Sequence, residues 1–97
     1  MIDQYKRSEN GASGHKNLSS SGTTTFTTAG DPKGRTIAYI KPIKGAATIT
    51  AISNITDSDG ITSVEFLQGE VVPGDYKSVV VESGEVMAFY NGRYLGD

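Results

Sequence analysis

Few side chains in this sequence could carry out catalysis. The chain has one histidine, His15, and no cysteine. General acid–base chemistry needs a group that is held in place with a tuned pKa, and the glycine- and serine-rich stretch around His15 offers neither position nor burial. We therefore expect His15 to be solvent-exposed, and we predict no catalytic residue, no cofactor-binding residue and no enzymatic activity.

The segment Asp57-Ser58-Asp59-Gly60 invites comparison with a calcium-binding loop. An EF-hand places oxygen ligands at alternate positions before its glycine and a glutamate six residues after it. Here Ile55 occupies the first ligand position and Phe66 occupies the position of the glutamate, so the loop does not fit. An Asp-Gly hairpin turn explains the same residues, and we predict no metal site.

The remaining carboxylates do not suggest a catalytic pair. Glycoside hydrolysis needs two carboxylates held across a cleft. The acidic residues of the second half fall mostly in or beside expected turns: Glu65, Glu70, Asp75, Glu82 and Glu85. A carbohydrate-binding β module remains an alternative, with surface tyrosines lining the sugar site: Tyr39, Tyr76, Tyr90 and Tyr94. The competing interpretation is that these tyrosines pack half-buried against the core.

The elements that must position these residues are unevenly distributed, because the composition changes near residue 35. Of the 23 residues from 8 to 30, fourteen are serine, threonine or glycine, and only seven of the first 35 residues are hydrophobic. Such a segment buries little apolar surface to offset the entropy lost on ordering. We therefore divide the chain into a flexible or extended N-terminal arm, residues 1–22, and an all-β domain, residues 23–97.

The arm has two interpretations. It is either a disordered tail or an extended segment that becomes ordered on a neighbouring subunit, with Tyr5, Leu18 and Phe26 as its anchors. The threonine-rich run 23–28 is prone to form a strand. It is expected to be the first strand of the domain, or an edge strand added to a partner.

From residue 35 onward, short apolar runs alternate with turn signals, and no window shows helical periodicity. The expected strands cover residues 36–43, 47–55, 61–67, 76–82 and 85–90. The expected turns lie at 31–34, 44–45, 57–60, 73–74 and 83–84, where glycine, proline or aspartate punctuates the chain. This pattern predicts an all-β fold, a small antiparallel sandwich or barrel with an extended N-terminal arm.

The last two expected strands are apolar on both faces, whereas a strand with one solvated face would alternate. This hairpin either lies between two packed layers or uses its second face to contact another chain. A 97-residue domain without disulfides has a thin core. We therefore favour a subunit interface and predict Val80, Met87 and Phe89 as interface residues, together with the three anchors of the arm.

Charge and hydropathy argue against several classes of partner. Residues 1–35 hold five basic and three acidic residues, and residues 36–97 hold four basic and eight acidic residues. This balance is too weak for a nucleic-acid footprint. No apolar run is long enough to span a membrane, and the first residues lack the apolar stretch of a signal peptide. We expect additional stability from a homo-oligomer, with a trimer possible.

The stretch from Leu67 to Tyr90, LQGEVVPGDYKSVVVESGEVMAFY, resembles the C-terminal part of small structural proteins encoded near the capsid genes of tailed bacteriophages. These proteins share a glycine-rich turn, a Pro-Gly-x-aromatic motif, a β-rich run, a Ser-Gly turn and an apolar strand that ends in an aromatic residue. The resemblance implies a virion component on the capsid surface, a decoration or cement protein. Its partner would be the major capsid protein or another virion subunit.

Two alternatives stay open beside this function. One is a head-completion, tail-adaptor or fibre-base subunit of the virion, and the other is the carbohydrate-binding module. The resemblance implies no catalytic residue and no cofactor.

Overall fold

A computed structural model describes residues 12–91 of the chain, with the backbone alone described at residues 12 and 13. Within this range the chain forms seven strands and no helix, and all strand pairs are antiparallel. The predicted all-β antiparallel fold is thus confirmed. The strands are β1 (Ala12–Ser19), β2 (Thr25–Thr27), β3 (Ile37–Pro42), β4 (Ala47–Ser53), β5 (Ile61–Phe66), β6 (Val72–Ser83) and β7 (Glu85–Asn91).

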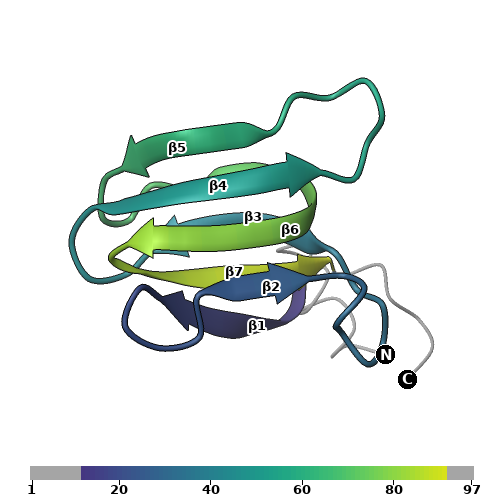
Figure 1. Ribbon diagram of the computed structural model, residues 1–97, viewed down its shortest axis with the longest axis horizontal. Coiled ribbons are helices and arrows are strands. Elements are labelled where there is room, and N and C mark those ends of the chain that lie inside the picture. The colour runs from purple at the N-terminus through teal and green to yellow at the C-terminus, as the bar shows by residue number, and fades with distance from the viewer. Residues whose placement is uncertain (1–11, 92–97) are drawn as a thin grey trace, which may run out of the picture.

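The strands belong to one sheet, in the order β1-β7-β3-β6-β4-β5, with β2 paired to β6 beside this path (Figure 1). The twelve-residue β6 joins the two halves of the sheet because it has three partners. Its first part pairs with β3, and its later part pairs with β4 along one edge and with β2 along the other. The sheet stays open, and β1 and β5 are its two end strands.

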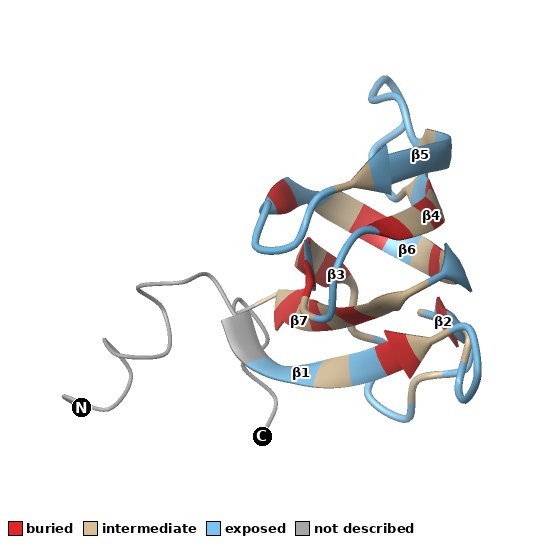
Figure 2. Cartoon of the chain, turned by 90° about the vertical axis from the view of Figure 1, so that its left-hand side faces the viewer, coloured by how far each residue is buried: buried red, intermediate tan, exposed pale blue. Residues whose placement is uncertain are grey.

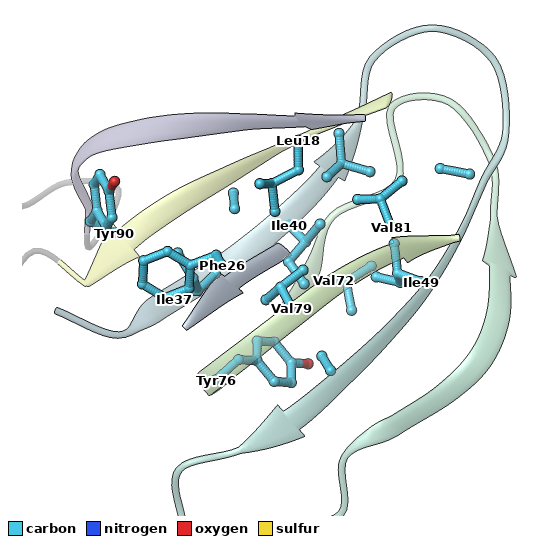
Figure 3. Packing of buried hydrophobic residues seen from close by; sticks show 14 residues of the cluster. Leu18, Phe26, Ile37, Ile40, Ile49, Val72, Tyr76, Val79, Val81 and Tyr90 are labelled. Atoms are coloured by element: carbon cyan, nitrogen blue, oxygen red, sulfur yellow. The ribbon is translucent and has the colours of Figure 1, made fainter. Parts of the chain in front are cut away.

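One face of the sheet encloses the apolar core. Side chains alternate along each strand with a period of two, so that Ile49 and Ala51 point inward from β4, and Val86 and Ala88 point inward from β7. Figure 3 shows the side chains of β1 and β7 across the core from those of β6 and β4. The core consists of Leu18, Phe26, Ile37, Ile40, Ala47, Ile49, Ala51, Val72, Tyr76, Val79, Val81, Val86, Ala88 and Tyr90.

Part of the predicted flexible or extended arm, residues 1–22, lies in the sheet. Residues 12–19 form β1, which pairs with β7, and Leu18 is 1% exposed within the core. A strand at the edge of a sheet needs few apolar residues of its own when its neighbours supply the core, and for this reason the serine- and glycine-rich composition was misleading. Residues 1–11, including Tyr5, lie outside the described part of the chain.

The last two strands are also arranged differently from the predicted hairpin. β6 and β7 meet at Gly84, but β7 pairs with β1 and β3 instead of with β6. Gly84 has a φ of 87°, and a Cβ placed on it would lie 2.6 Å from the carbonyl oxygen of Ala46. This position therefore requires glycine, and it turns the chain from one half of the sheet into the other. The turn predicted at Pro73-Gly74 lies within β6.

Two other predicted turns are confirmed. The amide of Gly34 donates to the carbonyl of Asp31 over 3.0 Å, which closes the turn at residues 31–34. β4 and β5 pair as a hairpin whose connection contains residues 57–60. In Figure 2, β5 is coloured almost entirely as exposed, in contrast to the inner strands.

Candidate functional site

The six predicted interface residues do not form one surface. Leu18 and Phe26 are 1% and 4% exposed in the chain's own core, so their assignment as anchors on a neighbouring subunit is wrong for this fold. Both residues point into the core from strands that pair within the sheet, β1 with β7 and β2 with β6. Tyr5 lies outside the described residues. Val80, Met87 and Phe89 are half-buried on outer sheet faces.

Met87 and Phe89 lie on the outer side of the half-sheet formed by β1, β7 and β3. They alternate with the inward-facing Val86, Ala88 and Tyr90. In the strand register Phe89 stands between His15 and Tyr39, and Met87 stands between Asn17 and Lys41. We call the surface made by His15, Tyr39, Met87 and Phe89 the aromatic face.

The rings of the aromatic face cover one another. The ring of Phe89 lies 4.5 Å from that of Tyr39, centroid to centroid, at an interplanar angle of 16°, and 5.5 Å from that of His15 at 43°. Pro73 is opposite Tyr39 on the next strand, β6. Such stacked rings present their edges to solvent, because their neighbours occupy the flat sides.

The charged groups of this half-sheet lie beside the aromatic rings. Lys41 is exposed beside Met87 on β3, and the polar Asn17 is exposed on the opposite side. Farther along β7, a carboxylate oxygen of Glu85 lies 3.7 Å from the ammonium nitrogen of Lys44. The aromatic face is therefore an apolar strip with a cation and an amide at its border, which is the composition of a protein contact surface.

Val80 lies on a different and more polar surface. It stands between Thr25 of β2 and Thr50 of β4, on the outer side of the other half-sheet. The hydroxyls of Thr50 and Ser63 donate hydrogen bonds to the carboxylate of Glu82, and these bonds lower its pKa. We call this surface, made by Thr25, Thr50, Ser63, Val80 and Glu82, the hydroxyl face.

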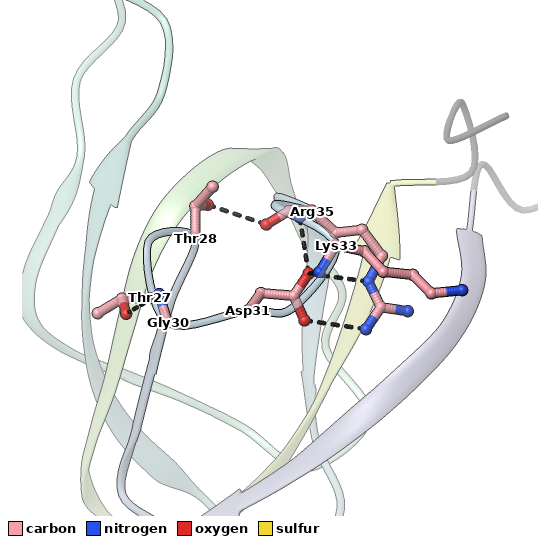
Figure 4. Close-up of polar contacts among 6 residues, drawn as sticks. All are labelled: Thr27, Thr28, Gly30, Asp31, Lys33 and Arg35. Carbon is pink, nitrogen blue, oxygen red and sulfur yellow. Dashed lines mark hydrogen bonds and ion pairs between the residues drawn. The ribbon is translucent and has the colours of Figure 1, made fainter. Parts of the chain in front are cut away.

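A groove of about 350 Å³ opens between β1, β2 and the turn at residues 31–34. The guanidinium of Arg35 lies on its wall, 3.7 Å from the centre of the Tyr90 ring, and forms two hydrogen bonds to the carboxylate of Asp31 (Figure 4). The bond from the Arg35 side chain is the main cause that lowers the pKa of Asp31 to about 2. The two charged groups neutralise each other, and their hydrogen bonds hold the loop of residues 31–35 in place.

The tyrosines considered for sugar binding differ in where the structure places them. Tyr76 and Tyr90 are 5% and 8% exposed in the core, so they are wrong as sugar-stacking residues. Tyr94 lies outside the described residues. Tyr39 is half-buried, and one side of its ring is stacked on Phe89. Sugar binding by ring stacking requires an open ring face, which Tyr76 and Tyr90 do not offer.

Within residues 12–91, no three His, Cys, Asp or Glu side chains come together as a group that could hold a metal. No described helix has the length and apolar character needed to cross a membrane. The segment predicted to be the N-terminal arm contributes His15 to the aromatic face. The one sequence signal that these residues form a strand was the isolated apolar Leu18, which lies three residues after His15 and therefore on the opposite side of β1.

No protein-family model, curated protein or solved structure significantly matches this chain. The function must therefore be argued from the geometry of the chain itself.

Proposed function

We propose that this chain is a structural binding module that attaches to other virion proteins through its aromatic face, as a capsid decoration or cement protein. The observation that carries the proposal is the stack of the half-buried Phe89 and Tyr39 with the exposed His15, on the outer side of a domain whose described core is formed by other side chains. Aromatic residues and methionine are enriched at protein interfaces, where their edges bury much area with little loss of side-chain entropy.

The contrast between the two outer surfaces supports this choice. The hydroxyl face satisfies its own polar groups, because Glu82 accepts hydrogen bonds from Thr50 and Ser63. The aromatic face presents carbon instead, since Met87 and Phe89 are left half-exposed where a solvated strand would carry polar residues. A partner that covers this face removes apolar area from water, and it must supply hydrogen bonds for the Tyr39 hydroxyl and the His15 ring nitrogens.

The resemblance of residues 67–90 to small phage structural proteins supplies the kind of partner. A capsid repeats one surface many times, so many copies of a small module add up to a strong attachment even where each contact is weak. No chemistry is needed for such a role, only buried area.

The proposal is tested by co-sedimentation of the protein with shells of the capsid protein encoded nearest to its gene. Phe89→Lys places a charge in the middle of the aromatic face, and Val80→Lys makes the same kind of change at a half-buried residue of the hydroxyl face. We expect wild type and Val80→Lys to saturate the shells with similar affinity and Phe89→Lys to bind at least about tenfold more weakly. Absence of wild-type binding, or equal binding of Phe89→Lys, would contradict the proposal.

A further inference from the structure

Charge is segregated along the chain and, through the strand order, across the sheet. Residues 12–44 hold five basic residues and one acid, whereas residues 45–76 hold five acids and no basic residue. The basic segment supplies β1, β2 and β3, and the acidic segment supplies β4, β5 and the start of β6. Of these residues, Lys16 lies on β1 and Glu65 lies on β5, so the two end strands carry opposite charges.

Within residues 12–91, each end strand has one edge without a strand partner. Among these residues β1 pairs only with β7, and β5 pairs only with β4, so each strand leaves one row of backbone donors and acceptors available. Proteins often protect such an edge with lysine or another charged side chain, with proline or with a bulge. β1 carries Lys16, and β5 carries Glu65 and an irregular register near Ser63, so a strand that pairs with either edge must match its charge. β5 also exposes 42% of Val64, an apolar side chain that an added strand would cover.

We propose that the occupant of the β5 edge is the β1 edge of a second copy of this chain, which gives a head-to-tail assembly. Pairing β5 with another β5 would place two copies of Glu65 in one interface, and like charges across an interface are unfavourable. Pairing β1 with β5 places Glu65 in the same interface as Lys16, the charged residue of a strand that has no acid. The charges thus favour pairing of β1 with β5 over pairing of β1 with β1 or of β5 with β5.

A head-to-tail contact has consequences that a two-fold contact does not have. Each copy uses two different surfaces, so the assembly closes as a ring or extends as a filament. The contact uses the edges of the sheet, whereas the proposed attachment to a capsid uses the aromatic face. The two proposals can therefore fail separately, and shell binding of the variant changed on β5, away from the aromatic face, distinguishes them.

The experiment blocks one edge at a time in the full-length chain. Lys16→Glu with Asn17→Glu makes the β1 edge acidic, and Val64→Lys with Glu65→Lys makes the β5 edge basic. Lys77→Glu, an exposed position on the inner strand β6, is the control for a change of charge away from both edges. Masses are measured by sedimentation equilibrium over a range of concentrations, with circular dichroism to verify that each variant keeps its β structure.

We expect wild type and Lys77→Glu to self-associate and each edge-blocked variant to be monomeric. An equimolar mixture of the two edge-blocked variants should associate again, because the intact β5 edge of one meets the intact β1 edge of the other and the two altered edges are also opposite in charge. This renewed association also proves that both variants are folded. A monomeric wild type, self-association of either blocked variant alone, or a mixture that stays monomeric would overturn the head-to-tail contact.

Discussion

At the scale of single residues, the molecule separates groups that fix its shape from groups that it leaves available. Asp31 and Arg35 are bound to each other, and Glu82 is bound to Thr50 and Ser63. By contrast, the ring of Phe89 contacts the rings of His15 and Tyr39 on an outer surface of the sheet. This division is why we assign structural roles to the carboxylates and a binding role to the aromatic rings.

Asp31 makes the stability of the fold depend on acid. Its pKa is about 2 in the folded chain, below its ordinary value of 3.8, mainly because of the hydrogen bond from Arg35. A lowered pKa means that the stabilisation is present above pH 4 and is lost as the pH falls toward 2. We expect Asp31→Asn to lower the free energy of unfolding at pH 6 by about 1 kcal/mol, a value reduced for the partial exposure of Arg35.

Urea unfolding at pH 6 and at pH 2 checks this expectation. The difference between Asp31→Asn and wild type should shrink at pH 2, because the native carboxylate is then half protonated. Asp57→Asn, in the exposed connection between β4 and β5, is the matched control and should leave the stability unchanged. A constant difference at both values of pH would show that the charge of Asp31 does not contribute.

At the scale of elements, β1 is part of the folded domain, and this can be tested with two leucines. Leu18 is 1% exposed on β1, and Leu67 is 64% exposed after β5. We expect Leu18→Ala to cost about 2–4 kcal/mol of stability, measured by thermal or urea unfolding, because it leaves a cavity between β1 and the core. Leu67→Ala should cost less than about 0.5 kcal/mol. Equal effects would mean that β1 does not pack as described.

The corner between β6 and β7 can be tested with two glycines of the same backbone conformation. Gly84 and Gly69 have φ values of 87° and 86°, but a Cβ at Gly84 would collide with backbone and one at Gly69 would meet no atom within 4 Å. We expect Gly69→Ala to cost about 1 kcal/mol for the conformation alone. Gly84→Ala should cost at least about 2 kcal/mol, since the collision adds to it. Similar melting temperatures for the two variants would contradict the close backbone contact at Gly84.

Much of the strand structure was predictable from local patterns, whereas the pairing was not. The expected strands at 36–43, 47–55, 61–67 and 85–90 lie within two residues of β3, β4, β5 and β7, because alternation and turn residues act locally. The strand β1 was missed since its stability comes from β7, far away in the sequence. For the same reason the aromatic face was only half predicted: Met87 and Phe89 were named, but His15 and Tyr39 join them only through the register.

At the scale of the whole molecule, we propose two kinds of contact surface on one domain. The aromatic face is apolar, and the sheet edges differ in charge, with five acids and no base in residues 45–76. Contacts that depend on charge weaken as salt screens them, whereas apolar contacts do not. We expect self-association, measured by sedimentation, to weaken when NaCl is raised from about 0.05 to 0.5 M, while shell binding through the aromatic face changes little. The reverse pattern would mean that the two surfaces are assigned the wrong way round.

The most direct measurement is a cryo-electron microscopy map of capsid shells saturated with this protein. Our account predicts density for the β domain seated with Met87, Phe89 and Tyr39 buried against the shell, and with Thr25, Val80 and Glu82 turned to solvent. A map in which the hydroxyl face makes the contact, or shells that carry no additional density, would contradict it.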